Sequence, residues 1–152
     1  MSPHVARLRA VVGHDLLLLP SASVFCIDDD GKMLLVRQAG SDKWSTLGGA
    51  VEIGESPAES AVRESFEELG IGVKLTRLLG VLGGPDYEIT YPNGDRVAYV
   101  VSAYEARIVE GTPFVNDGEL GGFGWFTRDE LPGIALSRFT RALLTEAGII
   151  PG

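Results

Sequence analysis

The segment that most constrains the fold is a helix with clear signals at both ends. Ser56 is a suitable N-cap, Pro57 fits the first helical position because its missing N–H needs no partner there, and Glu59 completes a capping box. Gly70 stands where a left-handed C-terminal cap is expected. One face of this helix carries three carboxylates within one to two turns. They belong to Glu64, Glu67 and Glu68.

These carboxylates are expected to need a counterion. Like charges three or four positions apart destabilise a helix by a few tenths of a kcal/mol per pair, whereas a bound divalent cation makes the cluster favourable. Carboxylate oxygens suit Mg²⁺ or Mn²⁺ better than zinc. Ser60 and Ala61 lie on the acidic face, where their small size leaves room for a ligand. The opposite face is predicted to pack on the core through Ala58, Val62, Ser65, Phe66 and Leu69.

The acidic run also has a plainer interpretation. Acidic helical segments are commonly solvated surfaces, and Glu59, Arg63 and Glu67 are spaced to form ion pairs between successive turns. Under this interpretation the carboxylates hold no ligand. The residues around the helix distinguish the two interpretations, because a solvated face does not require particular residue types at fixed positions.

The order of residues from 49 to 71, GAVEIGESPAESAVRESFEELGI, resembles the signature box of the Nudix hydrolases, the MutT-like family. It matches that box at every invariant position. Two nearby positions depart from the usual pattern. Ser65 stands where relatives carry a bulky aliphatic residue, and WSTLGG at 44–49 stands where relatives commonly read Trp-x-Leu-Pro-Gly-Gly. The missing proline is expected to loosen the loop entering the box without removing a ligand.

The resemblance implies a fold and a reaction. The fold is of the α/β class, an α/β/α sandwich with a mixed β-sheet. The reaction is hydrolysis of a nucleoside diphosphate linked to another group, NDP-X, in which water attacks a phosphorus of the diphosphate. Divalent ions clamp the phosphates and acidify the attacking water. We therefore expect a pyrophosphohydrolase that uses Mg²⁺, with Mn²⁺ as a substitute, and releases a nucleoside monophosphate from a substrate such as ADP-ribose or a nucleotide sugar.

The same resemblance assigns roles to residues of the box. Arg63 and Glu55 are expected to orient the acids through charged hydrogen bonds. Glu64 is interpreted as a metal ligand or as the base. The full set of predicted metal ligands is the Gly48 carbonyl, Glu64, Glu67 and Glu68.

Residues outside the box complete the predicted site. Glu119 is the candidate for an additional catalytic acid, with Asp117 second, because many relatives carry a glutamate on a loop in this region. A solvated loop acid is the alternative for both. Predicted substrate contacts are Arg37 for phosphate, and Trp44 and Tyr87 for stacking on a base, although a strand aromatic is more often part of the core.

Composition sets broader limits. A chain of 152 residues with 45% hydrophobic content fits one domain over residues 1–152, with residues 1–20 as an N-terminal extension of it. Net charge of −8 argues against a nucleic-acid polymer as main partner and favours a small nucleotide screened by metal. The early apolar run at 16–19 is too short to cross a membrane and no signal peptide is recognised, so a cytoplasmic location is expected. Because members of the family commonly form dimers, a homodimer is expected to pair through residues 86–107 and the N-terminal segment.

Turn and periodicity signals predict the remaining elements. Asn-Gly within 92–95 indicates a hairpin. A C-terminal amphipathic helix is expected over 137–147, with Ser137 as its cap, and a short N-terminal helix over 5–12. Strands are predicted at 21–27, 33–37, 73–82, 86–91, 96–107 and 123–126.

Other functions stay open at this point. A pyrophosphohydrolase that removes damaged nucleoside triphosphates uses the same box and is not separated from an NDP-X hydrolase by sequence. A ligand-sensing Nudix domain lacks turnover, but such domains usually lose box acids, and this chain keeps them all. An isomerase of isoprenoid diphosphates needs a catalytic cysteine. The single cysteine, Cys26, is predicted to be an inert thiol in a core strand.

Overall fold

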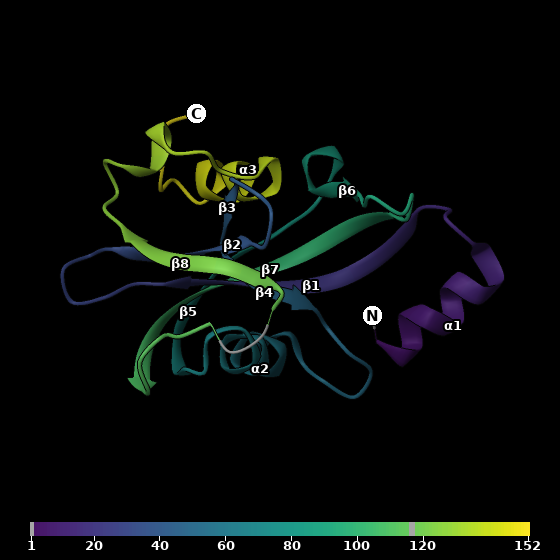
Figure 1. Ribbon diagram of the computed structural model, residues 1–152, viewed down its shortest axis with the longest axis horizontal. Coiled ribbons are helices and arrows are strands. Elements are labelled where there is room, and N and C mark those ends of the chain that lie inside the picture. The colour runs from purple at the N-terminus through teal and green to yellow at the C-terminus, as the bar shows by residue number, and fades with distance from the viewer. Residues whose placement is uncertain (1, 116–117) are drawn as a thin grey trace.

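A mixed β-sheet forms the centre of the computed structural model, which describes residues 2–115 and 118–152. In spatial order its strands are β4 (Leu47–Ala50), β1 (Leu17–Cys26), β7 (Arg96–Glu110) and β5 (Gly72–Leu82), and β6 (Glu88–Thr90) also pairs with β7 (Figure 1). Strands β1 and β7 run parallel, while the pairs β1/β4, β5/β7 and β6/β7 are antiparallel. The parallel pair makes the sheet mixed, as predicted.

A second, antiparallel sheet packs beside the first. Its strands are β3 (Trp44–Ser45), β2 (Met33–Gln38) and β8 (Leu120–Phe126), in that order. Residues of β2 alternate between two hydrophobic clusters, as the two-residue period of a strand requires. Leu34 and Val36 belong to one cluster, and Met33 and Leu35 belong to the other.

Two helices cover opposite faces of the central sheet. Helix α2 (Pro57–Leu69) lies over the cluster that contains Val24 and Leu34, and α3 (Arg138–Glu146) lies over the cluster that contains Phe25 and Leu35 (Figure 1). Short 3-10 helices at Pro85–Tyr87 (η1) and Leu131–Gly133 (η2) join strands and helices. This layering confirms the predicted α/β/α fold class. In the ranges that the structure describes, no helix combines the length and apolar character needed to span a bilayer.

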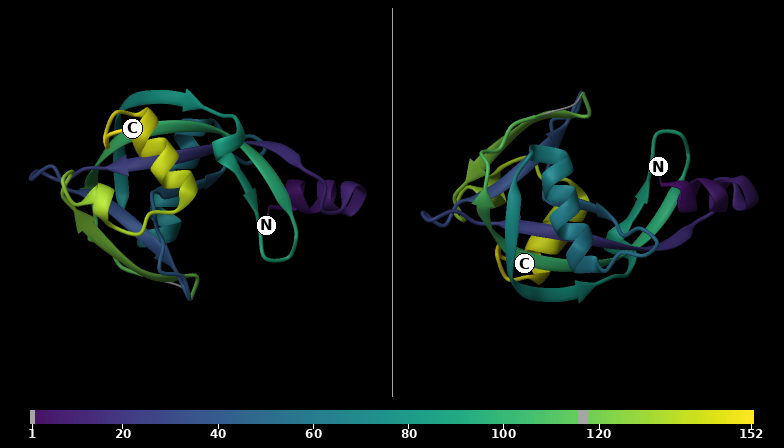
Figure 2. Two further views of the ribbon diagram at one scale, coloured as in Figure 1. Left: turned by 90° about the horizontal axis from the view of Figure 1, so that it is seen from above. Right: turned by 90° about the horizontal axis from the view of Figure 1, so that it is seen from below.

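Helix α1 (Pro3–Val12) lies at one end of the molecule, beside the turn between β6 and β7 (Figure 2). None of its ten residues, all of them described, is buried. It is attached through polar contacts instead. A terminal nitrogen of Arg9 donates to the Arg96 carbonyl at 2.8 Å, and His14 Nδ1 lies 2.7 Å from Asp95 Oδ1.

Most predicted elements form, with shifted ends. Helix α2 has both bonds of the capping box and a left-handed Gly70. Helix α1 begins at Pro3 because Ser2 caps it. Strands β3 and β4 were not predicted, since each is short and β4 contains two glycines. The strand predicted at 86–91 is instead η1 followed by a shorter β6.

The buried face of α2 differs from the prediction. Ser60, Ala61, Ser65 and Leu69 are its buried residues, whereas Val62 is 39% exposed and Phe66 is 63% exposed. Small side chains allow the helix backbone to lie close to β1 and β4, so steric fit overrides the hydrophobic stripe. This rotation brings Glu64 and Glu68 against Gly49 and Gly48 of β4, while Glu67 stays exposed.

Candidate functional site

The candidate site forms where strand β4 meets helix α2. Strand β4 is held against β1, with Gly48 opposite Ser23 and Gly49 opposite Ala22. The carbonyl of Ala50, at the end of β4, accepts hydrogen bonds from Arg63 at 3.3 Å and from the Ser60 hydroxyl at 3.4 Å. These two bonds fix the strand end next to the acidic residues of the helix.

Arg63 connects three carboxylates. Its Nε and one terminal nitrogen bind the two oxygens of Glu55 at 2.7 and 3.0 Å. Its other terminal nitrogen donates to Glu64 at 3.1 Å and to Glu67 at 2.9 Å. The bond to Glu55 is the main cause that raises the pKa of Arg63, and the same bond lowers the pKa of Glu55. Arg63 therefore stays protonated and contacts all three carboxylates, and its role in orienting them for catalysis stays a prediction.

Glu64 is a largely enclosed acid of the helix. Its side chain is 17% exposed and lies against Gly49, where an added Cβ would come within 2.6 Å of Glu64 Cδ. Glycine at 49 thus gives this carboxyl its space. Burial raises the pKa of Glu64, with the Glu67 charge adding to the rise and the Arg63 charge opposing it. Beside it, the Gly48 amide donates to Glu68 at 2.9 Å, which places Gly48 next to a second predicted ligand.

The donor chemistry of this cluster fits a hard divalent cation. One guanidinium serves three carboxylates, so negative charge is left without full compensation. The described residues contain no three His, Cys, Asp or Glu side chains that already converge on one metal position. Glu67 instead faces Arg63, and Glu68 faces the Gly48 amide. The box acids are thus assembled on one side of the helix but are oriented by protein partners.

A cavity of about 810 Å³, called here the acidic cavity, opens over these residues. Glu64, Glu67 and Arg63 line it, and Glu119 lines it from the segment before β8. The structure therefore brings Glu119 into the same cavity as the box acids, although its catalytic role stays a prediction. The second candidate, Asp117, lies outside the described residues.

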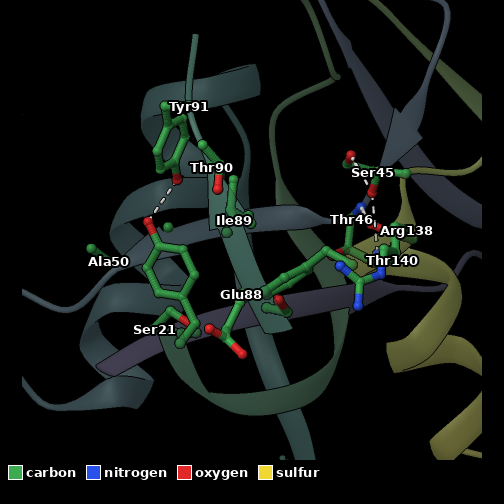
Figure 3. Close-up of a pocket in the computed structure, with 17 residues that line it drawn as sticks. Ser21, Ser45, Thr46, Ala50, Glu88, Ile89, Thr90, Tyr91, Arg138 and Thr140 are labelled. Atoms are coloured by element: carbon green, nitrogen blue, oxygen red, sulfur yellow. Dashed lines mark hydrogen bonds between the residues drawn. The ribbon is translucent and has the colours of Figure 1, made fainter. Parts of the chain in front are cut away.

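A second cavity of about 440 Å³ adjoins the first and was not identified from the sequence. Figure 3 shows its walls, with Ser21 on β1, Thr46 near β4, and Thr140 on α3. Because its hydroxyls are its common feature, it is called here the hydroxyl cavity; its hydroxyl-bearing residues are Ser21, Ser23, Ser45, Thr46, Thr90, Tyr91, Tyr99, Ser137 and Thr140. Serines at alternate positions of the apolar strand β1, 21 and 23, were the available sequence signal.

The predicted substrate contacts lie elsewhere. Tyr87 is fully buried between the sheet and α3, with its ring edge-on to Phe139, and this corrects its assignment as a base-stacking residue. Arg37 donates to the carbonyls of Ser41 and Gly121, both at 3.1 Å, and covers the ring of Trp44. Neither Arg37 nor Trp44 lines the acidic or the hydroxyl cavity. Tertiary packing explains these positions, because Tyr87 packs against Phe139 and Arg37 packs against Trp44.

Comparison with known proteins identifies the family. The model of the NUDIX domain matches residues 17–146. A MutT-like protein from Streptomyces ambofaciens is 33% identical over 107 residues, which cover 69% of this chain and 61% of that protein. The NAD-capped RNA hydrolase NudC of Mycobacterium tuberculosis (strain ATCC 25618 / H37Rv) is 29% identical over 145 residues, which cover 83% of this chain and 39% of that protein.

A solved structure is also similar over nearly the whole chain. The crystal structure of a UDP-X diphosphatase superposes with a TM-score of 0.69 and 25% identity, covering 97% of this chain and 71% of that one. The chain spans between 34% and 61% of the length of the first curated relatives that it matches. These matches confirm the resemblance seen in residues 49–71 and its reading as a hydrolase domain.

Proposed function

The chain belongs to the NUDIX family, and we propose that it hydrolyses the diphosphate of an NDP-X substrate to release a nucleoside monophosphate. The observation that carries this proposal is the junction of the two cavities. Ala50, Tyr91 and Tyr99 line both the acidic and the hydroxyl cavity. A nucleoside in the hydroxyl cavity thus extends its phosphates past Ala50 toward Glu64 and Glu67.

The hydroxyl cavity suits a nucleoside chemically. Its hydroxyls donate and accept hydrogen bonds, while Ile89 and Phe139 supply apolar contact for a planar base. Arg138 also lines the cavity, and its guanidinium donates to the Pro85 carbonyl at 3.3 Å and pairs with Asp86 at 3.5 Å. The cavity volume of about 440 Å³ lies within the range of small-molecule sites.

Protein groups at the junction of β4 and α2 have separable roles in this mechanism. The metal ligands would be Glu64, Glu67, Glu68 and the Gly48 carbonyl, with Mg²⁺ or Mn²⁺ as the ion. When bound, such an ion neutralises phosphate charge and lowers the pKa of the attacking water. Arg63 orients Glu64 and Glu67, and Glu55 anchors Arg63 through a bidentate pair. Glu64 or Glu119 accepts the proton of the attacking water.

Two similar proteins support the substrate class. The UDP-X diphosphatase and the NAD-capped RNA hydrolase are both named for substrates in which a diphosphate joins a nucleoside to a second group. The second name also introduces a capped RNA end as a substrate, against which the net charge of −8 argues. Nucleoside triphosphates remain the competing substrate class.

A hydrolysis panel tests the proposal. Purified protein with Mg²⁺ or Mn²⁺ is given ADP-ribose, UDP-glucose, NADH, the nucleoside triphosphates and NAD-capped RNA, and released monophosphate is measured. We expect the highest kcat/KM among the NDP-X compounds. Preferred hydrolysis of triphosphates would replace NDP-X by the competing class, and tight binding without turnover would indicate a sensing domain.

Substitutions of the box acids test the assigned roles. Glu67→Gln and Glu68→Gln are each expected to lower metal-dependent turnover by about 100-fold or more, since each removes a charged ligand while keeping its shape. Asp129→Asn is the matched control, because it removes one carboxylate from an exposed position in the connection between β8 and η2. Full activity in either glutamine variant, with circular dichroism unchanged, would remove the metal-ligand assignment.

A further inference from the structure

Helix α1 lies outside the part of the chain that matches the family model, yet it lines the acidic cavity. The match begins at residue 17, whereas α1 covers residues 3 to 12. Pro3, Val5 and Arg9 of this helix face the same cavity as Glu64 and Glu67. The box acids alone therefore do not define the shape of the cavity, and a segment outside the match to the family model forms one of its walls.

A polar clamp holds α1 in that position. The Arg9 side chain is 9% exposed, and its Nε lies 3.6 Å from the Asp95 carboxylate. Its terminal nitrogens donate to the carbonyls of Gly13, Asp15 and Arg96. His14 reaches the same Asp95 oxygen at 2.7 Å. The end of α1 is thus fixed to the turn between β6 and β7, which itself lines the cavity through Asn93 and Asp95.

The acidic cavity and the hydroxyl cavity meet at a boundary formed by two tyrosines. Tyr91 and Tyr99 line both cavities, and their hydroxyl oxygens are 2.7 Å apart (Figure 3 shows Tyr91 at this position). The hydroxyl cavity continues from this boundary toward α3, and the acidic cavity continues toward α1. A substrate whose diphosphate lies at the box acids therefore has room for a group on each side. A nucleoside triphosphate leaves the α1 side empty.

The charge of the acidic cavity favours an uncharged group as X, the part of the substrate beyond the diphosphate. Two guanidinium groups line it, Arg9 and Arg63, and both are already bonded to carboxylates and carbonyls. Acidic residues outnumber them; they are Glu52, Glu64, Glu67, Asp95 and Glu119. A metal ion held by Glu64 and Glu67 would offset the charge of the diphosphate, but an anionic X beyond it meets the like charge of Glu52, Asp95 and Glu119, whereas the hydroxyls of a sugar can donate to these carboxylates.

We propose that α1 forms the outer wall of the subsite for X, and that X is an uncharged, hydroxyl-rich group such as a sugar. This inference rests on the proposed NDP-X hydrolysis and adds the side of the cleft and the chemistry of X. Val5 is the wall residue that decides how much room X has. Arg9, His14 and Asp95 are positioning residues, because they act by holding the helix.

A pair of tryptophan variants on α1 tests the wall. Val5→Trp adds a large side chain at the cavity, and Val11→Trp adds the same side chain on the same helix where the residue is 85% exposed and does not line the cavity. Kinetics with ADP-ribose and UDP-glucose are compared with inhibition by ADP and UDP, which lack X. We expect Val5→Trp to raise KM for the NDP-sugars by about tenfold or more, because the new ring occupies the space of X. The inhibition constants of ADP and UDP stay unchanged, and Val11→Trp behaves as wild type.

A second variant and a second substrate pair address the clamp and the charge. His14→Ala removes one of the two side chains that hold the end of α1 at Asp95 and is expected to raise KM for the NDP-sugars with kcat within about twofold. UDP-glucuronate differs from UDP-glucose by one carboxylate on X, and its kcat/KM is expected to be about tenfold lower because of like-charge repulsion. Equal kcat/KM for these two substrates would overturn the charge argument.

The outcomes separate the two proposals. Hydrolysis of NDP-sugars that Val5→Trp leaves unchanged overturns the α1 subsite while the proposed function stands. Parallel weakening of NDP-sugars, ADP and UDP by Val5→Trp also overturns it, since the substitution then acts on the whole site. No hydrolysis of any NDP-X compound by the wild-type protein overturns both.

Discussion

Gly49→Ala is expected to damage activity without unfolding the protein. A Cβ at residue 49 would lie 2.6 Å from Glu64 Cδ and 3.0 Å from one of its oxygens, whereas ordinary contacts begin at 3.4 Å. The Glu64 carboxyl must therefore move by about 1 Å. The atoms that must move are at the end of a flexible side chain, so the free energy of unfolding should fall by less than about 1 kcal/mol.

The displaced carboxyl is expected to cost more in catalysis. A shift of about 1 Å in a positioned group can reduce the rate by about 100-fold, which corresponds to about 2.7 kcal/mol of transition-state stabilisation. Steady-state kinetics on the preferred NDP-X substrate measure kcat/KM, and urea denaturation measures stability. Gly133→Ala is the control, since among the described residues nothing lies within 4 Å of the added methyl group. Wild-type kcat/KM in Gly49→Ala would refute the reasoning, because Glu64 would then not need its observed position.

At the neighbouring Gly48, substitution is expected to affect the stability of the fold. Gly48 has a φ of +147°, and a Cβ there would press on the backbone of Ala22 and lie 3.0 Å from Ser23 Cα. Backbone atoms within a paired strand cannot move aside as a side chain can. Gly48→Ala should therefore lower the free energy of unfolding by about 2 kcal/mol or more, and the contrast between the two glycines separates a catalytic effect from a folding effect.

Two further predictions concern buried polar groups. Ser65 is fully buried and its hydroxyl donates to the Ala61 carbonyl at 2.9 Å. Ser65→Ala should therefore change the free energy of unfolding by less than about 1 kcal/mol, whereas Ser65→Leu should lower it by about 1–3 kcal/mol through overpacking. Urea denaturation distinguishes the two variants, and a leucine variant as stable as wild type would show that α2 can move away from the sheet. Burial raises the pKa of Cys26 to about 11, so the native thiol should resist alkylation at pH 9, while unfolding in urea should restore the reaction. Because the unfolded thiol ionises from about pH 8.5 and the folded one does not, Cys26 should lower stability as pH rises between these values, by at most about 1.4 kcal/mol per pH unit.

Local interactions explain how much could be predicted from the sequence. The ends of α2 depend on a cap and a left-handed glycine that lie within a few residues of each other, so Ser56, Glu59 and Gly70 predicted them correctly. The identity and order of the acids depend on the same short segment. Fold class followed from the resemblance of that segment to a family, because the alternation of strands alone left the architecture less certain.

Contacts between distant residues were beyond such reasoning. Hydrophobic periodicity placed Phe66 against the core, but the close approach of α2 to β1 and β4 favours small side chains and leaves Phe66 exposed. The hydroxyl cavity gathers residues from β1, β4, β6 and α3, which no local pattern relates to one another. From the sequence, Tyr87 was predicted to be accessible for stacking on a base, whereas in the structure α3 packs over its ring and buries it.

The sequence alone therefore determined the chemistry, because carboxylates on one short helix keep their spacing whatever surrounds them. The tertiary structure decided which way those carboxylates face, what lies beside them and where a substrate has room. Steric packing and long-range hydrogen bonds set these features. The clearest case is α1, which reaches the acidic cavity because Arg9 and His14 meet Asp95, a residue more than 80 positions later in the chain.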